Sequence, residues 1–155
     1  MNQQRRDMLR VSTVLGLAVA TGLMTPKDAR AAAEGWNSAA FDTKSLNDTI
    51  KALGGTTAAT SKDLVITAPD IAENGAVVPV SVTTKLADVQ QIAILVEKNP
   101  NALSANFTIP PGTDAYVSTR VKMAQTSNIH ALVKVDGKWL VASKEIKVTL
   151  GGCGG

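Results

Sequence analysis

The sequence is poor in the residues that most often build catalytic and metal sites. Its 155 residues include one cysteine, one histidine and only 3% aromatic residues. A single cysteine cannot form an internal disulfide, and one histidine without a Cys-x-x-Cys motif supplies too few ligands for an ordinary metal site. The sequence also has no G-x-S-x-G, no H-E-x-x-H and no phosphate-binding glycine loop before a helix. We therefore expect no metal, no cofactor and no self-sufficient enzyme.

Residues 1–33 have the pattern of an export signal. Arg5 and Arg6 precede an uncharged run over 11–24, which is shorter than the about 20 residues of an ordinary membrane span. An A-x-A pattern follows and predicts cleavage after Ala31 or Ala33. The twin arginine is typical of signals that export folded proteins. We expect a periplasmic protein without a permanent membrane anchor.

The net charge of the chain depends on this amino-terminal segment. The whole chain has 16 Lys and Arg against 13 Asp and Glu, a net charge of +3. Residues 1–33 hold five of the basic and two of the acidic residues, so 11 of each remain and the mature charge is close to zero. The remainder has no basic cluster and few aromatic residues, so we expect no nucleic-acid partner.

Residues 34–150 are long enough for one domain, and the domain begins with a helical signal. Ser45 is a good N-cap, Asp48 favours the positive start of a helix, and apolar residues recur at helical spacing until Gly54. Gly54 suits the left-handed conformation that ends a helix. These residues predict one short helix, and the small polar segment 56–62 after it is expected to be a loop.

From residue 64 onward the apolar residues form short runs or alternate with polar ones, which indicates strands. Asp136-Gly137 is a hairpin turn pair, whereas Pro79 favours an edge strand or a bulge. Short strands separated by turn residues predict an all-β fold, an immunoglobulin-like antiparallel β-sandwich with a short N-terminal helix. The expected strands cover 64–67, 76–83, 91–97, 107–109, 116–123, 129–135, 139–141 and 145–150.

Few polar residues of this domain are candidates for chemistry. His130 is alone on a strand face and is expected to be a surface residue or a satisfied structural one. Asp114 and Asp136 lie beside turn residues and are expected to serve turns.

The last five residues, Gly151, Gly152, Cys153, Gly154 and Gly155, form a different kind of segment. Glycine loses much entropy when it is ordered, so the pentapeptide 151–155 is expected to be a flexible arm. Fully extended, the arm reaches about 17 Å beyond the last strand. Its backbone is slim enough to enter a narrow tunnel in another protein. An unpaired cysteine in an exported chain indicates a reactive or intermolecularly paired thiol.

The thiol of Cys153 has no activating group beside it in the sequence. Nearby cations, histidine or a helix start lower a cysteine pKa, and none of them is adjacent. The nearest fixed charge is the carboxylate of Gly155, which disfavours a thiolate. Activation must therefore come from a partner's active site, and this favours a thiol that carries a substrate.

A twin-arginine signal, a β-rich domain and a terminal Gly-Gly-Cys-Gly-Gly together resemble the SoxY family of sulfur carriers. The resemblance extends over the whole chain and is most specific at 151–155. It implies a heterodimer with a SoxZ-like β-sandwich subunit and covalent attachment of thiosulfate-derived intermediates to Cys153. It also implies that a c-type haem enzyme joins thiosulfate to the sulfur and that a hydrolase releases sulfate.

Two other readings of the tail remain open. In the first, Cys153 forms an intermolecular disulfide and the glycines are a tether in an exported interaction protein. In the second, the chain is a sulfur donor of the ubiquitin-like type, whose terminal Gly-Gly carries sulfur on its carboxylate. The export signal and the position of Cys153 speak against the second reading, since that class is cytosolic.

Overall fold

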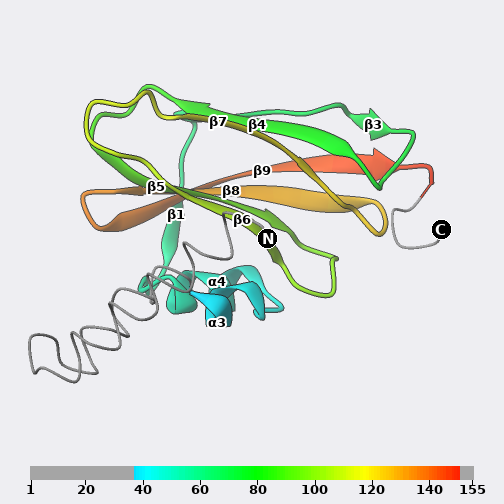
Figure 1. Ribbon diagram of the computed structural model, residues 1–155, viewed down its shortest axis with the longest axis horizontal. Coiled ribbons are helices and arrows are strands. Elements are labelled where there is room, and N and C mark those ends of the chain that lie inside the picture. Colours follow the sequence, from blue (N-terminus) through cyan, green and yellow to red (C-terminus); the bar gives the residue numbers. More distant parts are fainter. Residues whose placement is uncertain (1–36, 151–155) are drawn as a thin grey trace, which may run out of the picture. The chain divides into compact units, whose positions relative to one another are not determined.

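The computed structural model describes residues 37–150, and this part of the chain is a β-sandwich with short helices at its start (Figure 1). The predicted immunoglobulin-like sandwich with an N-terminal helix is confirmed. The elements are α3 (Ser38–Phe41), α4 (Leu46–Ala52), β1 (Ala58–Thr60), β2 (Leu64–Thr67), β3 (Ile71–Ala72), β4 (Val78–Thr84), β5 (Val89–Val96), β6 (Leu103–Thr108), β7 (Tyr116–Val121), β8 (Ser127–Val135) and β9 (Lys138–Val148).

The strands form two sheets that face each other. The larger sheet has the order β1-β9-β8-β5-β6, with β3 also paired to β9, and the smaller sheet has the order β2-β4-β7. The chain therefore passes repeatedly between the sheets, as it does in immunoglobulin-like domains. Strands β2, β4 and β7 pair antiparallel, as do β5, β6, β8 and β9.

Two pairings go beyond the antiparallel pattern that the sequence predicts. Strands β1 and β3 both run parallel to β9, with Ala58 opposite Trp139 and Ile71 opposite Lys147. Strand β1 lies inside the segment 56–62 that we expect to be a loop. Both strands are too short to show a periodic pattern in the sequence, so they are identified only by their hydrogen-bonded pairing with β9.

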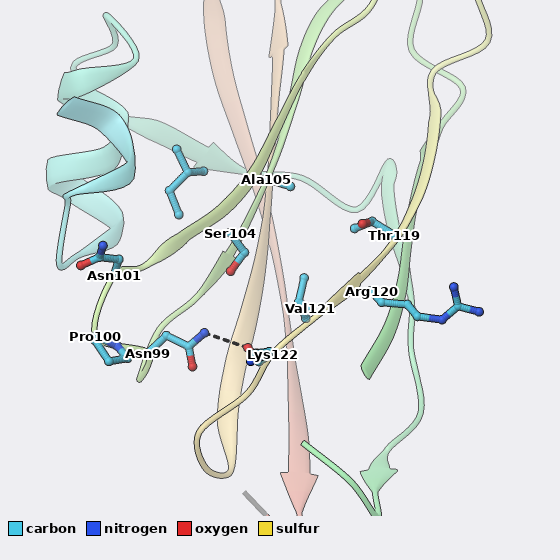
Figure 2. A pocket seen from close by; sticks show the side chains of 10 residues that line it. Asn99, Pro100, Asn101, Ser104, Ala105, Thr119, Arg120, Val121 and Lys122 are labelled. Atoms are coloured by element: carbon cyan, nitrogen blue, oxygen red, sulfur yellow. Dashed lines mark hydrogen bonds between the residues drawn. The ribbon is translucent and has the colours of Figure 1, made fainter. Parts of the chain in front are cut away.

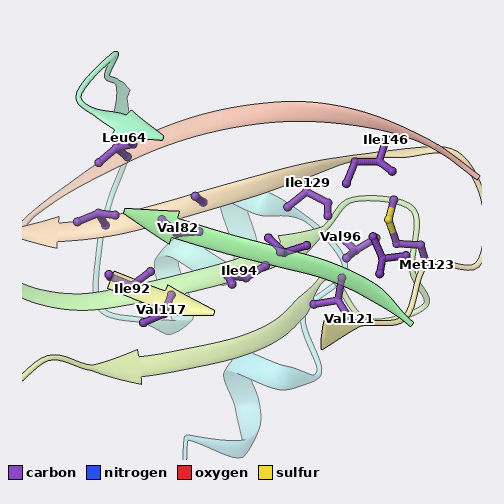
Figure 3. Close-up of a cluster of buried hydrophobic side chains, with 14 of the residues drawn as sticks. Leu64, Val82, Ile92, Ile94, Val96, Val117, Val121, Met123, Ile129 and Ile146 are labelled. Atoms are coloured by element: carbon purple, nitrogen blue, oxygen red, sulfur yellow. The ribbon is translucent and has the colours of Figure 1, made fainter. Parts of the chain in front are cut away.

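The main core fills the space between the two sheets (Figure 3). Alternate residues of each strand point into it, because successive side chains of a strand lie on opposite faces. Fully buried members are Val78, Val80, Val82, Ile92, Ile94, Val96, Met123, Ile129, Ala131, Val133 and Ile146.

A second core lies on the other face of the larger sheet, where α3 and α4 cover it (Figure 1). Ile50 and Leu53 of the α4 segment pack there against Leu95, Leu132 and Trp139. Leu132 breaks the alternation of β8 in the sequence, and this helix layer is the reason. Strands β5 and β8 are buried on both faces, so they form the rigid centre of the domain.

The residues that the sequence identifies as a helix start, a helix stop and a hairpin turn have these roles in the structure. The side chain of Ser45 accepts a 3.1 Å hydrogen bond from the N–H of Asp48 at the start of α4. Gly54 has a φ of +81° just after the helix. Asp136 and Gly137 have φ of +48° and +74° and join β8 to β9 in a two-residue hairpin.

Pro79 lies in β4, which is the central strand of the smaller sheet. It pairs with Arg120 of β7, whereas β2 ends opposite Ser81. Pro79 therefore has a neighbouring strand on one side only, and this agrees with the edge position that the missing N–H requires.

Candidate functional site

The candidate site residues of the tail and the signal lie outside the residues that the structure describes. This applies to Cys153 and its four glycines, 151–152 and 154–155, and to Arg5 and Arg6. What the structure does describe is the base from which the tail leaves, at the end of β9 (Figure 1). The site is therefore built from the contacts that hold this base.

One side of the β9 end is held by the segment that follows β2. The N–H of Lys147 donates to the carbonyl of Asp70 at 3.0 Å, and the N–H of Thr149 donates to that of Ala72 at 3.1 Å. The hydroxyl of Thr149 also donates to the carbonyl of Glu73 at 3.1 Å. Parallel pairing thus continues past the last residue of β9.

The last contact of this ladder lies at Leu150. The N–H of Gly75 donates to the carbonyl of Leu150 at 2.7 Å, and the carbonyl of Gly75 accepts from the N–H of Met123 at 2.7 Å. Asn74 shapes this turn, since its side chain accepts a 2.8 Å hydrogen bond from the N–H of Ala76. The backbone is therefore fixed up to the residue before the glycines.

The other side of β9 is held by the loop between β7 and β8. The hydroxyl of Thr126 accepts a 2.9 Å hydrogen bond from the N–H of Val148. Sequence reasoning does not find that the Asn74-Gly75 turn and Thr126 hold the tail base. No local pattern could show it, because these contacts join segments that are far apart in the chain.

A surface pocket of about 400 Å³ lies between β6 and β7 (Figure 2). Asn99 bridges it: its amide donates to the carbonyl of Lys122 at 2.8 Å and its side-chain oxygen accepts from Ala124 at 3.1 Å. Arg120 points away from the pocket (Figure 2). The lining residues include no carboxylate, histidine or cysteine, and within residues 37–150 no base is hydrogen-bonded to the hydroxyls of Ser104 and Thr119.

His130 is a satisfied structural residue, as the sequence predicts. Its Nδ1 shares a 2.7 Å hydrogen bond with the hydroxyl of Ser143, and its Nε2 lies 3.7 Å from Oε2 of Glu97. The side chain is 12% exposed. Burial lowers the pKa of His130 below its ordinary value of 6.5, although the charge of Glu97 acts in the opposite direction.

His130 lies far from Leu150, the last described residue. It is paired with Ser143 of β9, and seven residues separate Ser143 from Leu150. At about 3.3 Å per residue this is about 23 Å, whereas any three extended residues span about 10 Å. Within residues 37–150, no cluster of three or more His, Cys, Asp or Glu could hold a metal ion.

The described helices α3 and α4 are both short. No helix in the part of the chain that the structure describes is long and apolar enough to cross a membrane.

The fold and the anchored β9 end define a class: an immunoglobulin-like β-sandwich that presents its C-terminal residues from a rigid strand end. The family model of the sulfur oxidation protein SoxY matches residues 50–153, a range that includes Cys153. The chain therefore belongs to the SoxY family, whose members carry sulfur in sulfur oxidation. Membership implies partners of the same system, such as SoxZ.

Comparison with solved structures gives the same result. The sulfur carrier protein SoxY from Chlorobium limicola f thiosulfatophilum is similar over 68% of this chain and 96% of its own, with 39% identity and a TM-score of 0.62. The superoxide reductase (neelaredoxin) from Ignicoccus hospitalis is similar over 55% and 79%, with 20% identity and a TM-score of 0.50, and shares the fold. The comparison with curated proteins gave no match.

Proposed function

We propose that this chain carries thiosulfate-derived sulfur covalently on Cys153 in the periplasm. Residues 1–33 are its twin-arginine signal, 34–150 its carrier domain and 151–155 a flexible arm that presents the thiol to successive enzymes. The observation that carries the proposal is the anchored base: backbone hydrogen bonds hold the chain up to Leu150, and the only cysteine follows three residues later. The match of the family model through Cys153 supports the same assignment.

The proposed cycle begins with an oxidation. The thiol of Cys153 loses its proton, its sulfur bonds to the outer sulfur of thiosulfate, and the two electrons pass to a c-type haem partner enzyme. A hydrolase then adds water at the sulfonate sulfur and breaks its bond to the former outer sulfur of thiosulfate. Sulfate leaves, and that outer sulfur stays on Cys153 as a persulfide. Further oxidation and hydrolysis remove the remaining sulfur and return the thiol.

The carrier domain itself is proposed to be non-catalytic. His130 is paired with Ser143, about 23 Å along β9 from Leu150, and the lining of the pocket between β6 and β7 includes no carboxylate, histidine or cysteine. A thiol without a neighbouring base is a poor nucleophile at neutral pH, so it is activated only in a partner's active site. A SoxZ-like subunit is proposed to complete the carrier as a heterodimer.

The test is the intact mass of the mature protein after incubation with thiosulfate and its haem partner, before and after reduction. We expect a reducible adduct of thiosulfate mass on the wild type and none on Cys153→Ser, with the two proteins equally resistant to urea. If Cys153→Ser still acquired the adduct, the carrier assignment would be wrong. A wild type that forms only a reducible dimer would support the disulfide tether instead.

A further inference from the structure

Asn74 and Gly75 form the only Asn-Gly pair in the sequence. They lie in the turn between β3 and β4, where Asn74 is exposed and Gly75 is buried. The side-chain amide of an asparagine can be attacked by the backbone nitrogen of the residue that follows it. Glycine in that position hinders the attack least, because it has no Cβ and the widest range of backbone conformations. This pair is therefore a candidate for spontaneous modification.

The reaction needs only water and a base. The backbone nitrogen of Gly75 loses its proton to hydroxide or buffer and bonds to Cγ of Asn74, and the side-chain amide nitrogen leaves as ammonia. Water then opens the resulting succinimide ring at one of its two carbonyls. Opening at one carbonyl gives aspartate. Opening at the other gives isoaspartate, in which the main chain runs through the former side chain and is longer by one methylene group.

The turn holds the side chain of Asn74 close to the reacting nitrogen. Its Oδ1 accepts a 2.8 Å hydrogen bond from the N–H of Ala76, so the side chain folds back over the peptide that contains the nitrogen of Gly75. The same oxygen gains negative charge when Cγ is attacked, and a backbone N–H that already points at it stabilises that charge. The side chain is therefore arranged for ring closure.

The hydrogen bond that ends the β9 ladder opposes the attack. The N–H of Gly75 donates to the carbonyl of Leu150 at 2.7 Å, so the nitrogen is free neither to lose its proton nor to turn toward Cγ. Thr149 supports this contact, since its N–H and its hydroxyl donate to the carbonyls of Ala72 and Glu73, both at 3.1 Å. Ring closure must therefore wait until the end of β9 opens locally, and strand ends open more readily than the core.

We propose that Asn74 is a site of spontaneous deamidation to isoaspartate, and that the hydrogen bond between Gly75 and Leu150 controls its rate. The product has one more negative charge and a longer main chain, so the N–H of Gly75 no longer meets the carbonyl of Leu150. The fixed backbone then ends at Thr149, and the modification keeps the end of β9 open once it has formed. The inference does not depend on what Cys153 carries.

The experiment follows the formation of isoaspartate in the mature chain during incubation at pH 8. The protein is sampled over time and digested, and the peptide that contains Asn74 is separated into its amide, aspartate and isoaspartate forms by chromatography and mass. Thr149→Val removes the hydroxyl that donates to Glu73 and keeps the shape of the side chain. Thr67→Val, at an exposed threonine of β2, is the matched control, and Asn74→Ser cannot form the ring. The wild type in urea gives the rate without tertiary contacts.

We expect the folded wild type to form isoaspartate at position 74 more slowly than the chain in urea. Thr149→Val should form it about fivefold faster than the folded wild type, because loss of one hydrogen bond makes opening of the strand end that much more frequent. Thr67→Val should match the wild type, and urea denaturation should show that every variant is folded at the start. Hydrogen exchange should find the amide of Gly75 protected in fresh protein and in Asn74→Ser, and unprotected in the isoaspartate form.

Three results would overturn the proposal. A folded wild type that gains no isoaspartate would show that Asn74 is not a modification site. Equal rates in Thr149→Val and the wild type, or in the folded wild type and the chain in urea, would show that the end of β9 does not control the reaction. An isoaspartate form in which the amide of Gly75 stays protected would show that the modification leaves the base of the tail intact.

Discussion

The backbone N–H of Gly75 donates a 2.7 Å hydrogen bond to the carbonyl of Leu150, the last residue before the terminal glycines. This bond ends a parallel ladder that begins with Ile71 beside Lys147. The chain is thus held by tertiary contacts up to one residue and then continues into four glycines and a cysteine. A rigid base is useful to a carrier because it limits the volume in which the thiol must be found by an enzyme.

Loss of the hydrogen bond between Thr126 and Val148 should make the end of β9 less stable. In Thr126→Val the N–H of Val148 loses its side-chain acceptor while the size of the side chain is kept. We expect a loss of about 1 kcal/mol in the free energy of unfolding, measured by urea denaturation. Thr67→Val, at an exposed threonine of β2, is the control and should stay close to the wild type. Equal stability of all three proteins would show that Thr126 does not hold the strand end.

Gly55 should tolerate no side chain, because it lies against the second core. A Cβ built on it would lie 2.3 Å from Cδ1 of Trp139 and 2.8 Å from Cγ2 of Ile50. We expect Gly55→Ala to lower the free energy of unfolding by about 1–3 kcal/mol and to change the fluorescence of Trp139. A stable Gly55→Ala with unchanged fluorescence would contradict the close packing of α4 on the sheet.

His130 should make the stability of the domain depend on pH. Burial, only partly opposed by Glu97, lowers the folded pKa below the ordinary 6.5, so the unfolded chain binds more protons just below that pH. The stabilising effect of the neutral imidazole is complete above pH 6.5 and decreases as the pH falls toward the folded pKa. The measurement is the free energy of urea unfolding at pH 7.5 and pH 5, compared between the wild type and His130→Gln. If both proteins lose the same stability between these pH values, another group is responsible.

Bulk at the arm should affect enzymes rather than folding. In Gly152→Trp a large side chain precedes Cys153, so we expect slower turnover of the loaded arm by the partner hydrolase and an unchanged free energy of unfolding. Gly152→Ala should lie between this variant and the wild type. Loading by tetrathionate, which needs no channel, is the control and should be similar in all three. Equal hydrolase rates would count against a narrow channel.

Much of the fold is predicted by local chemistry. The cap at Ser45, the stop at Gly54 and the hairpin at Asp136-Gly137 each depend on one or two residues and their immediate neighbours, and each lies where the sequence predicts it. The alternation of apolar and polar residues likewise indicates most strands of the sandwich. The interpretation of Cys153 as a functional thiol is also local, since it depends on the glycines around it.

The features that the sequence does not reveal all depend on partners far along the chain. Strands β1 and β3 exist because β9 offers them a free edge, and the bond from Thr149 to Glu73 joins residues 76 positions apart. The second core explains the apolar Leu132 only once α4 is seen to cover that face.

The sequence by itself determined the all-β class, the helix start and stop, the tight hairpin and the composition of the tail, because these follow from the conformational preferences of single residues and from periodicity. The tertiary structure alone decided that Gly75 and Thr126 hold the end of β9 and that His130 is paired with Ser143, seven residues before Leu150. The physical reason is that hydrogen-bond partners and exposure depend on which distant segments meet, and the parallel pairing of β3 with β9 has no signature in either strand alone.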